Sequence, residues 1–531
     1  VQRGTTLSAN DGISSYGNLT TISESPTSPN VLYVGTDDGN IHGTRDAGTN
    51  WVMLSGDMPG LAAPNTVVTR VVASRFNEGR VYATFDGHER DDYRPYVYRS
   101  DDYGNTWEPI VSGLPDDATV NIIVEHPRNE NLLFLGNEIG VFVSIDRGDS
   151  WAQLKNNLPT VPVDDIVIHP RENDLVLGTH GRGIWILDDI TPLEEISEDV
   201  LNTDAHIFSA RRTPMWRVTR WQEWSPGTWR VLNPAPGARI HYYLKEDAPL
   251  PSPTVDARRD DGGGRSGGRG GGRGGANQMP SSVPATPPEP TVKLTVLDGN
   301  GGFVREFEGP GRAGVQTALW DFRIADAYTT TTSGGGFGGG GRRGGGGGPR
   351  GPEVLPDTYT VRLEAGGRTT ETTVEVVLDP RIQVPMDVLQ DRQDAMMDAY
   401  NLAKPVYEAR QAIGAINDQL NNMRGLLSDD APEALTSALD DITRDVGEIQ
   451  ENMQEAGAGA GAVNTIQSFA GEPTADQLWQ IDQSWRLLPG VIEQINVVIT
   501  DRMPGLIAMV YQSGVGPAPL DTIEIPTRPA R

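Results

Sequence analysis

One eight-residue pattern occurs three times in this chain and limits its fold more than any other feature of the sequence. The pattern is Ser or Thr, any residue, Asp, any residue, Gly, any residue, a small polar residue, and Trp. Its copies occupy residues 44–51, 100–107 and 144–151. Repeats spaced by about 40–50 residues are typical of β-propellers, in which each repeat forms one blade of a ring. The pattern therefore predicts a β-propeller for the first part of the chain.

The residue types of this pattern, the Asp-box or BNR motif, suit a tight turn between two strands. The Asp side chain can accept hydrogen bonds from backbone N–H groups inside the turn. The Gly can adopt a positive φ, and the Trp is large enough to pack between neighbouring blades. We therefore predict a structural role for these positions. They are Asp46, Gly48 and Trp51, then Asp102, Gly104 and Trp107, and finally Asp146, Gly148 and Trp151.

Each blade is predicted to be a sheet of four antiparallel strands, and the blades span residues 1–195. In the first blade the strands are expected at residues 19–23, 31–36, 40–44 and 50–55. A fourth blade is expected at residues 164–187, but its box has decayed, because Asp189 is present without the Gly and the Trp. Propellers commonly close with more than four blades, and a last blade that lacks its outer strand normally takes one from the N-terminal end. We therefore expect further blades N-terminal to this sequence.

Residues 196–380 alternate between apolar and polar side chains and predict a second β domain. Strands are expected at residues 237–244, 291–297, 303–308, 316–323, 358–363 and 370–378. The turn at residues 298–301 and the segment 355–361 resemble an immunoglobulin-like or fibronectin-like β-sandwich. Gly-rich segments with interspersed Arg, at about 252–290 and 333–352, interrupt this domain. We expect flexible loop insertions there, since the segments hold almost no aromatic residue that could stack on RNA bases.

From residue 381 to residue 531 the apolar residues repeat with a helical period. Helices are expected with apolar faces within residues 388–423, 435–453 and 478–495. Pro405 should kink or split the first of them, and a Gly/Ala-rich linker is expected at 456–462. The pattern predicts an antiparallel helical bundle, although the same faces could bind a partner helix. The predicted fold is thus mainly β with a C-terminal α domain.

The composition excludes several classes of function. The formal net charge is −28, which argues against binding to nucleic acid or to an anionic membrane surface. The chain has no Cys, so disulfides, thiol nucleophiles and Cys-ligated metals are excluded. It also lacks a run of about 20 apolar residues, so we expect no membrane insertion.

Three segments resemble a known family. Residues 16–26, 86–92 and 177–189 are similar to the C-terminal half of large secreted bacterial proteins with sortilin-type, or BNR-repeat, propellers, which are often described as glycosyl-hydrolase-like. The resemblance implies export, so that the protein would be secreted, periplasmic or on the cell surface. It also implies a larger parent protein, whose N-terminal blades would be partners of this chain. It implies no particular activity, because fold likeness does not establish function.

The turns between the second and third strands of the blades carry most of the chemically versatile side chains. These turns lie on the face opposite the Asp boxes, where propellers usually bind ligands around a central channel. The turn in the second blade is longer than the others and holds several charged residues. The candidate ligand-binding residues on this face are Asp37, Asp38, Asp86, His88, Asp91, Asp92, Glu138, His180 and Arg182.

The long turn allows two further interpretations. Asp86, His88, Asp91 and Asp92 could ligate a divalent cation, or they could brace a surface loop; no other cofactor is expected. The carboxylates of Asp86, Asp91 and Glu138 are candidates for the acid and base pair of a glycoside hydrolase. A sialidase would also need a cluster of arginines, for which Arg182 is the one obvious candidate.

These observations favour a secreted, non-catalytic binding protein whose propeller face recognises a peptide or glycan. Two alternatives remain open from the sequence. One is a glycoside hydrolase of the Asp-box propeller type that uses paired carboxylates. The other is a structural or cell-surface assembly protein, in which the sandwich and the bundle attach the propeller to a surface or to a second subunit.

Overall fold

The computed structural model describes residues 17–217, 235–250, 289–328, 350–427 and 431–512. The chain divides into two compact units. The first unit comprises the residues up to 211 together with 241–246 and 313–315, and the second unit comprises the remainder. Most of the two predicted Gly-rich insertions lies outside the described residues. The domain boundaries predicted at residues 195 and 380 stay predictions.

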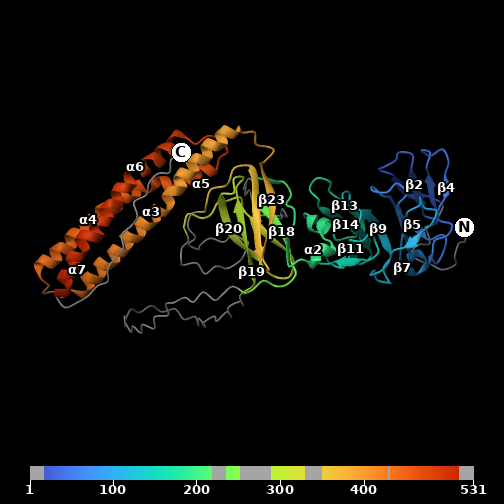
Figure 1. The fold of residues 1–531 in the computed structure, drawn as a ribbon, viewed down its shortest axis with the longest axis horizontal. Helices are drawn as coiled ribbons and strands as arrows, with labels where there is room; N and C mark the ends of the chain where they lie inside the picture. The colour runs from blue at the N-terminus through green and yellow to red at the C-terminus, as the bar shows by residue number, and fades with distance from the viewer. Residues whose placement is uncertain (1–16, 218–234, 251–288, 329–349, 428–430, 513–531) are drawn as a thin grey trace, which may run out of the picture. The chain divides into compact units, whose positions relative to one another are not determined.

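The first unit contains four antiparallel sheets in which the strands follow one another in chain order, as predicted for propeller blades (Figure 1). Blade 1 is β1 (Leu19–Glu24), β2 (Leu32–Thr36), β3 (Ile41–Thr44) and β4 (Val52–Met53). Blade 2 is β5 (Val67–Ala73), β6 (Val81–Gly87), β7 (Asp92–Ser100) and β8 (Glu108–Pro109). Blade 3 is β9 (Val120–Glu125), β10 (Leu133–Asn137), β11 (Gly140–Ser144) and β12 (Ala152–Leu154). Blade 4 has three strands, β13 (Val163–Ile168), β14 (Leu175–Thr179) and β15 (Ile184–Leu187).

The box of blade 2 shows how the repeated pattern closes its turn. Asp102 Oδ1 accepts a 2.8 Å hydrogen bond from the backbone N–H of Thr106, and Asp102 Oδ2 accepts one of 2.7 Å from the Thr106 hydroxyl. The backbone N–H of Gly104 donates to Ser100 Oγ at 2.8 Å. Tyr103 and Gly104 both have positive φ, so the turn contains two consecutive left-handed residues. Boxes 1 and 3 repeat these contacts.

We expect Asp102→Ala to lower the free energy of unfolding of the first unit by about 1–2 kcal/mol, because the amide and the hydroxyl of Thr106 lose their acceptors. Urea unfolding followed by Trp fluorescence measures this change. Ligand binding by the folded fraction should be unchanged, since the box lies on the face opposite the candidate site. A variant that melts like the wild type but no longer binds its ligand would contradict the structural role.

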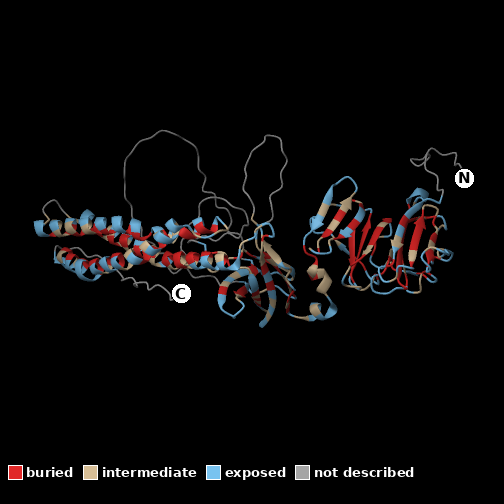
Figure 2. Cartoon of the chain, turned by 90° about the horizontal axis from the view of Figure 1, so that it is seen from above, coloured by how far each residue is buried: buried red, intermediate tan, exposed pale blue. Residues whose placement is uncertain are grey.

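The buried Trp residues of the second and third boxes join their blades to the preceding blade. The box Trp of one blade donates its indole N–H to a carbonyl of the preceding blade, Trp107 to Leu54 and Trp151 to Ile110, both at 2.9 Å. Both Trp side chains are buried, whereas Trp51 of blade 1 is 42% exposed. Figure 2 shows the strands of the first unit with long buried segments. The box Trp is therefore a connector between blades, as its size predicts.

His126 and His169 occupy the same repeat position and close the turns between the first and second strands. The backbone N–H of Arg128 donates to His126 Nδ1 at 3.2 Å, and that of Glu172 donates to His169 Nδ1 at 3.0 Å. His126 is fully buried, and its Nε2 lies 2.9 Å from Asn173 Oδ1. Burial lowers the pKa of His126 below its ordinary value of 6.5.

We expect the first unit to lose stability as the pH falls from about 7.5 to about 5.5, because the unfolded chain then binds a proton that folded His126 does not. The folded-state pKa lies below the unfolded value, so this contribution is present above pH 6.5 and is lost below it. Urea unfolding at a series of pH values measures the slope. His126→Gln should reduce that slope, and an unchanged slope would show that other groups control the transition.

The second unit contains a five-stranded sheet in the order β17-β23-β22-β19-β20. Its strands are β17 (Thr213–Met215), β19 (Thr291–Leu297), β20 (Phe303–Pro310), β22 (Asp357–Ala365) and β23 (Arg368–Leu378). β17 runs parallel to β23, and the other pairs are antiparallel. A three-stranded sheet has the order β16 (Ala205–Ile207), β18 (Ala238–Leu244) and β21 (Gly314–Trp320). The immunoglobulin-like or fibronectin-like identity of this region stays a prediction.

The C-terminal part of the second unit is helical, as predicted. Its long helices are α3 (Met386–Leu426), α4 (Glu433–Ala456) and α6 (Ala475–Val497), with the shorter α5 (Ala462–Gln467) and α7 (Met503–Gln512). Most residues of the predicted apolar faces form one buried cluster along these helices (Figure 2), whereas Leu478 is 39% exposed. Within the described residues, none of the helices is both long and apolar enough to cross a membrane.

Two local features of the helices differ from the expectations. Pro405 does not split its helix: it lies inside α3, which continues through it, and buried neighbours such as Leu402 and Val406 belong to the same core. A kink at Pro405 stays a prediction. The expected Gly/Ala linker is the short 3-10 helix η2 (Ala458–Gly461). Gly459 lies so close to α6 that an added Cβ would be 2.7 Å from Ser484 Oγ. Small residues are needed there for close packing.

Candidate functional site

The first strand of each blade, which we call the inner strand, contains a β-bulge at the same place. The pairing register with the second strand skips one residue in each blade, namely Thr20, Thr69, Asn121 and Asp164. All four are polar. A bulge re-aims the skipped side chain and is common beside functional sites.

The bulge residues of blades 1 to 3 connect each blade to the next. Thr20 Oγ1 donates to the carbonyl of Val68 at 2.6 Å, and Thr69 Oγ1 donates to that of Val120 at 2.9 Å. Asn121 Nδ2 donates to the carbonyl of Val163 at 3.4 Å. In each case the acceptor is the residue just before the next bulge. We call this series the bulge ladder.

The candidate turns lie at the same end of the blades as the bulge ladder. The backbone N–H of Asp37 donates to the carbonyl of Asn18 at 3.0 Å, just ahead of the first inner strand. Glu138 makes the same contact with Thr119 in blade 3, and His180 makes it with Pro162 in blade 4. The turns β2–β3, β6–β7, β10–β11 and β14–β15, with the starts of the inner strands, thus form one surface, which we call the turn face.

In blade 1, the two candidate aspartates brace their own turn. Asp37 Oδ1 accepts hydrogen bonds of 2.9 Å from the backbone N–H groups of Gly17 and Asn18. Asp38 Oδ1 accepts a hydrogen bond from the Thr36 hydroxyl. Both carboxylates therefore have local partners.

The long turn of blade 2 contains the 3-10 helix η1 (His88–Arg90). Asp86 accepts from the backbone N–H of His88 at 2.9 Å and also contacts the His88 ring. Asp91 has a left-handed backbone with φ of 58°. Asp92 accepts two hydrogen bonds of 2.9 Å from the guanidinium of Arg94 and one of 2.6 Å from Tyr96. The hydrogen bonds from Arg94 lower the pKa of Asp92 to about 2.

These contacts decide the chemistry of the long turn. Asp86 and Asp92 point toward donors of their own turn and are therefore not directed at a common ion. Across the described ranges, no group of three or more His, Asp or Glu is arranged to hold a metal ion. The divalent cation suggested for residues 86–92 thus finds no cluster of ligands there.

The remaining candidates lie in blades 3 and 4. Asn121 Nδ2 lies 3.2 Å from Glu138 Oε1, so Glu138 also has a partner. His180 Nδ1 lies 3.1 Å from Asp164 Oδ2, and the two side chains are 80% and 51% exposed. Arg182 is exposed between Gly181 and Gly183, which both have positive φ. The structure shows no contact that joins any two of Asp86, Asp91 and Glu138.

The sequence did not single out an ion pair between blades 2 and 4. Arg70 Nη2 lies 3.1 Å from Asp165 Oδ1, and both residues directly follow a bulge residue. The side chains are 36% and 61% exposed, so the pair lies at the solvent-facing side of the inner strands. Aligning the inner strands by their bulges would have marked Arg70, Asn121, Asp164 and Asp165 together. The box motif alone does not reveal that alignment.

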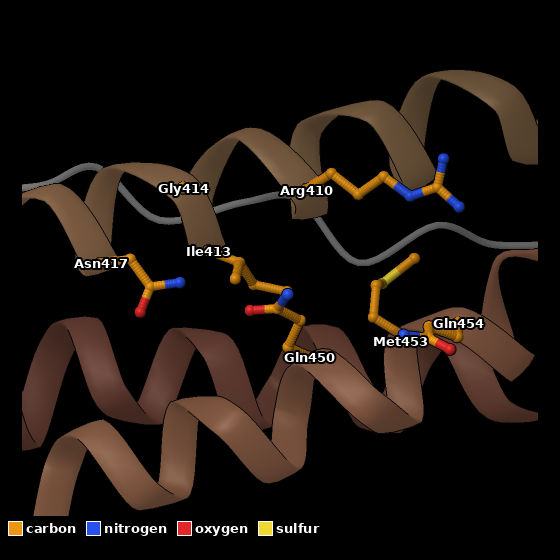
Figure 3. Close-up of a pocket in the computed structure, with 7 residues that line it drawn as sticks. All are labelled: Arg410, Ile413, Gly414, Asn417, Gln450, Met453 and Gln454. Carbon is orange, nitrogen blue, oxygen red and sulfur yellow. The ribbon is translucent and has the colours of Figure 1, made fainter.

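One pocket in the described residues lies elsewhere, between α3 and α4 of the second unit (Figure 3). Arg410 and Asn417 on α3 and Gln450 on α4 supply polar groups, while Ile413 and Met453 supply apolar ones. These residues include neither a carboxylate nor a nucleophile, so the pocket offers no acid–base chemistry.

A match to one family model supports the propeller over part of the chain. Residues 95–219 match the family model Sortilin-Vps10, described as sortilin, neurotensin receptor 3. A search of curated proteins found no match. A GH74 xyloglucanase from Xanthomonas campestris has 13% identity over 68% of this chain and 54% of its own, with a TM-score of 0.28. An ancestral GH74 enzyme has 17% identity over 32% and 23%, with a TM-score of 0.26. YCF48 bound to D1 peptide has 12% identity over 43% and 63%, with a TM-score of 0.25.

The matched part of this chain spans less than two thirds of each of these three structures. The family match covers blades 3 and 4 and begins within β7 of blade 2. The three box turns and the four sequential sheets show a partial β-propeller, and residues 95–219 of it are similar to the Sortilin-Vps10 family.

Proposed function

We propose that this chain is a non-catalytic binding protein that acts outside the cytoplasm and recognises a peptide or glycan on its turn face. One observation carries the proposal: two of the three candidate catalytic carboxylates already accept hydrogen bonds from their own surroundings. Asp86 contacts His88 and Glu138 contacts Asn121. Asp92, in the same turn as Asp86, contacts Arg94 and Tyr96.

Acid–base chemistry on a glycosidic bond has different requirements. A general acid needs a raised pKa, and its partner carboxylate must lie across the bond from it. The pKa of Asp92 is instead lowered to about 2, so this carboxylate stays ionised at neutral pH. The hydrogen bonds that Asp86 and Glu138 already accept therefore favour recognition over turnover.

The exposed groups of the turn face suit a polar, extended ligand. His180 with Asp164, and Arg70 with Asp165, present donors and acceptors side by side with much of each side chain in water. Arg182 adds an exposed guanidinium on the same face. Peptide backbones and glycan hydroxyls both offer the alternating donors and acceptors that such a surface can pair with.

The test measures binding to a glycan array and to a displayed peptide library, followed by titration of the best binder from each. Arg182→Ala should weaken the binding at least tenfold, because a charged hydrogen bond is lost. Arg171→Ala is the matched control, since Arg171 is an equally exposed residue on the opposite turn of the same blade. Equal losses of affinity in the two variants would show that the ligand does not bind on the turn face.

A glycoside hydrolase remains the second candidate, and a turnover assay separates it from the binding protein. Glycan hydrolysis that disappears in Asp86→Asn or Asp91→Asn would establish the enzyme. Saturable binding without hydrolysis would establish the binding protein. A structural role in assembly, the third candidate, would show neither result and would depend on the second unit.

A further inference from the structure

The far side of blade 4 repeats the surface that blade 3 presents to blade 4. In blade 3, Val141 and Val143 of β11 are 2% and 8% exposed, because blade 4 covers them. The strand register places Ile184 and Ile186 of β15 at the equivalent positions in blade 4. These two side chains are 74% and 58% exposed. Val167 of the inner strand is also 54% exposed. We call Val167, Gly178, Ile184 and Ile186 the blade-4 face.

A glycine in the second strand of blades 1, 3 and 4 indicates what would cover the blade-4 face. In blades 1 and 3 this glycine packs against the inner strand of the next blade. An added Cβ at Gly35 would lie 2.5 Å from Val68 of the next blade, and one at Gly136 would lie 2.6 Å from the carbonyl of Val163 of the next blade. Gly178 has the same place in blade 4, yet its nearest neighbour is Asp165 of its own blade at 3.6 Å. The slot that an inner strand fills at the other junctions is thus open at Gly178.

The bulge ladder changes its chemistry at this junction. The bulge residues of blades 1 to 3 donate a hydrogen bond to a carbonyl of the next blade. The bulge residue of blade 4 is Asp164, whose carboxylate accepts hydrogen bonds, and its Oδ2 lies 3.1 Å from His180 Nδ1 of the same blade. A strand docked here in the usual register would therefore have to offer Asp164 a donor in place of the usual carbonyl.

We infer that the blade-4 face docks the inner strand of a further Asp-box blade, and that this strand presents a hydrogen-bond donor or a cationic side chain to Asp164. The apolar part of the interface continues the three junctions already present in the chain. The polar part selects the occupant through the charge of Asp164. The N-terminal blades that the sequence analysis expects as partners would have to meet this requirement.

The need for a hydrogen-bond donor opposite Asp164 argues against a second copy of this chain as the occupant. Blade 1 has a free apolar side, where Ile22 is 67% and Trp51 is 42% exposed, so its shape could match the blade-4 face. In the register of the other junctions, however, blade 1 would place the carbonyl of Leu19 against Asp164. Two acceptors would then face each other without a proton between them, which costs binding free energy.

The experiment uses blade 1 of the chain itself as the probe blade. Sedimentation velocity over a wide concentration range measures self-association of the full chain. Asp164→Asn supplies an amide donor that can reach the Leu19 carbonyl, so its self-association should be roughly tenfold tighter than that of the wild type. Asp117→Asn is the control, because it removes the same charge from an exposed residue outside the blade-4 face, and its self-association should equal that of the wild type.

A second substitution locates the interface. Gly178→Val fills the open slot with a side chain whose Cβ has no neighbour closer than 3.6 Å, and thermal melting verifies that the variant folds. The double variant Asp164→Asn with Gly178→Val should lose the added association. Three results would overturn the inference: wild-type self-association as tight as that of Asp164→Asn, an Asp164→Asn variant no tighter than Asp117→Asn, or a double variant that still associates. The first of these would identify a second copy as the occupant.

Discussion

Gly136→Ala should destabilise the first unit by about 1–3 kcal/mol, which is the usual cost of forcing extra atoms into a packed interior. The added Cβ would lie 2.6 Å from the carbonyl of Val163 and 2.8 Å from Ile122 Cγ2. The first obstacle is backbone of the next blade, so a rotamer change cannot relieve it. Relief would require blade 3 and blade 4 to separate slightly along their shared apolar surface. Urea unfolding gives the change in free energy.

Gly178→Ala is the control for this prediction, because it makes the same substitution at the same position of the next blade. No atom lies within 3.4 Å of the Cβ that it adds, and Gly178 has no positive φ. Replacing Gly in a strand also reduces the entropy of the unfolded chain, so this variant should be as stable as the wild type or slightly more stable. Similar losses for both variants would show that the packing of blade 4 on blade 3 does not explain the effect.

The blades could be predicted from the sequence because their information is local. A box fixes one turn within eight residues, and the apolar alternation on either side fixes the strands next to it. The decayed box of blade 4 is followed by no fourth strand in its sheet, in agreement with the expectation. Local patterns also identified the apolar faces of the helices, since these depend only on a period of 3.6 residues.

The candidate site was less predictable, because nearness in sequence is a poor guide to the direction of a side chain. Asp86, Asp91 and Asp92 form a group in the sequence, yet in the structure they lie in a turn where short acidic side chains pair with backbone and neighbours. Conversely, Arg70 and Asp165 are 95 residues apart, and only the curvature of successive blades brings them together. Their contact depends on two blade junctions at once, which no local pattern encodes.

The bulge ladder shows the same limit for a repeated feature. The skipped residues are two threonines, an asparagine and an aspartate, so they share a hydrogen-bonding role and not an identity. A search for identical residues passes over them. The register of each sheet has to be known before the donor in three blades and the acceptor in the fourth become visible.

Glu353→Gln should destabilise the second unit by about 2–3 kcal/mol, because it removes the negative charge from a cluster of arginines. Glu353 Oε2 lies 3.3 Å from Arg217 Nη2, and its Oε1 lies 3.6 Å from Arg323 Nη2. Buried Arg392 donates to the carbonyl of Gln467 at 3.1 Å, and Arg217 donates to the same carbonyl at 2.9 Å. The amide of the variant keeps the size of the side chain but removes the carboxylate beside Arg217, and Arg323 then keeps only the more distant Asp321 at 4.0 Å.

This cluster joins the five-stranded sheet to the helices within the second unit, so hydrogen exchange resolved by segment is the suitable measurement. The protection of backbone amides from exchange should fall around Gln467 and at the start of α3, while the amides of the blades in the first unit should keep their protection. Added salt should reduce the difference, since it screens the repulsion between the arginines. Glu364→Gln is the control: its ion pair with Lys293 spans 3.0 Å on the exposed side of the same sheet, so its loss should leave protection unchanged. Protection that falls equally in both variants would assign the effect to the sheet as a whole and not to the arginine cluster.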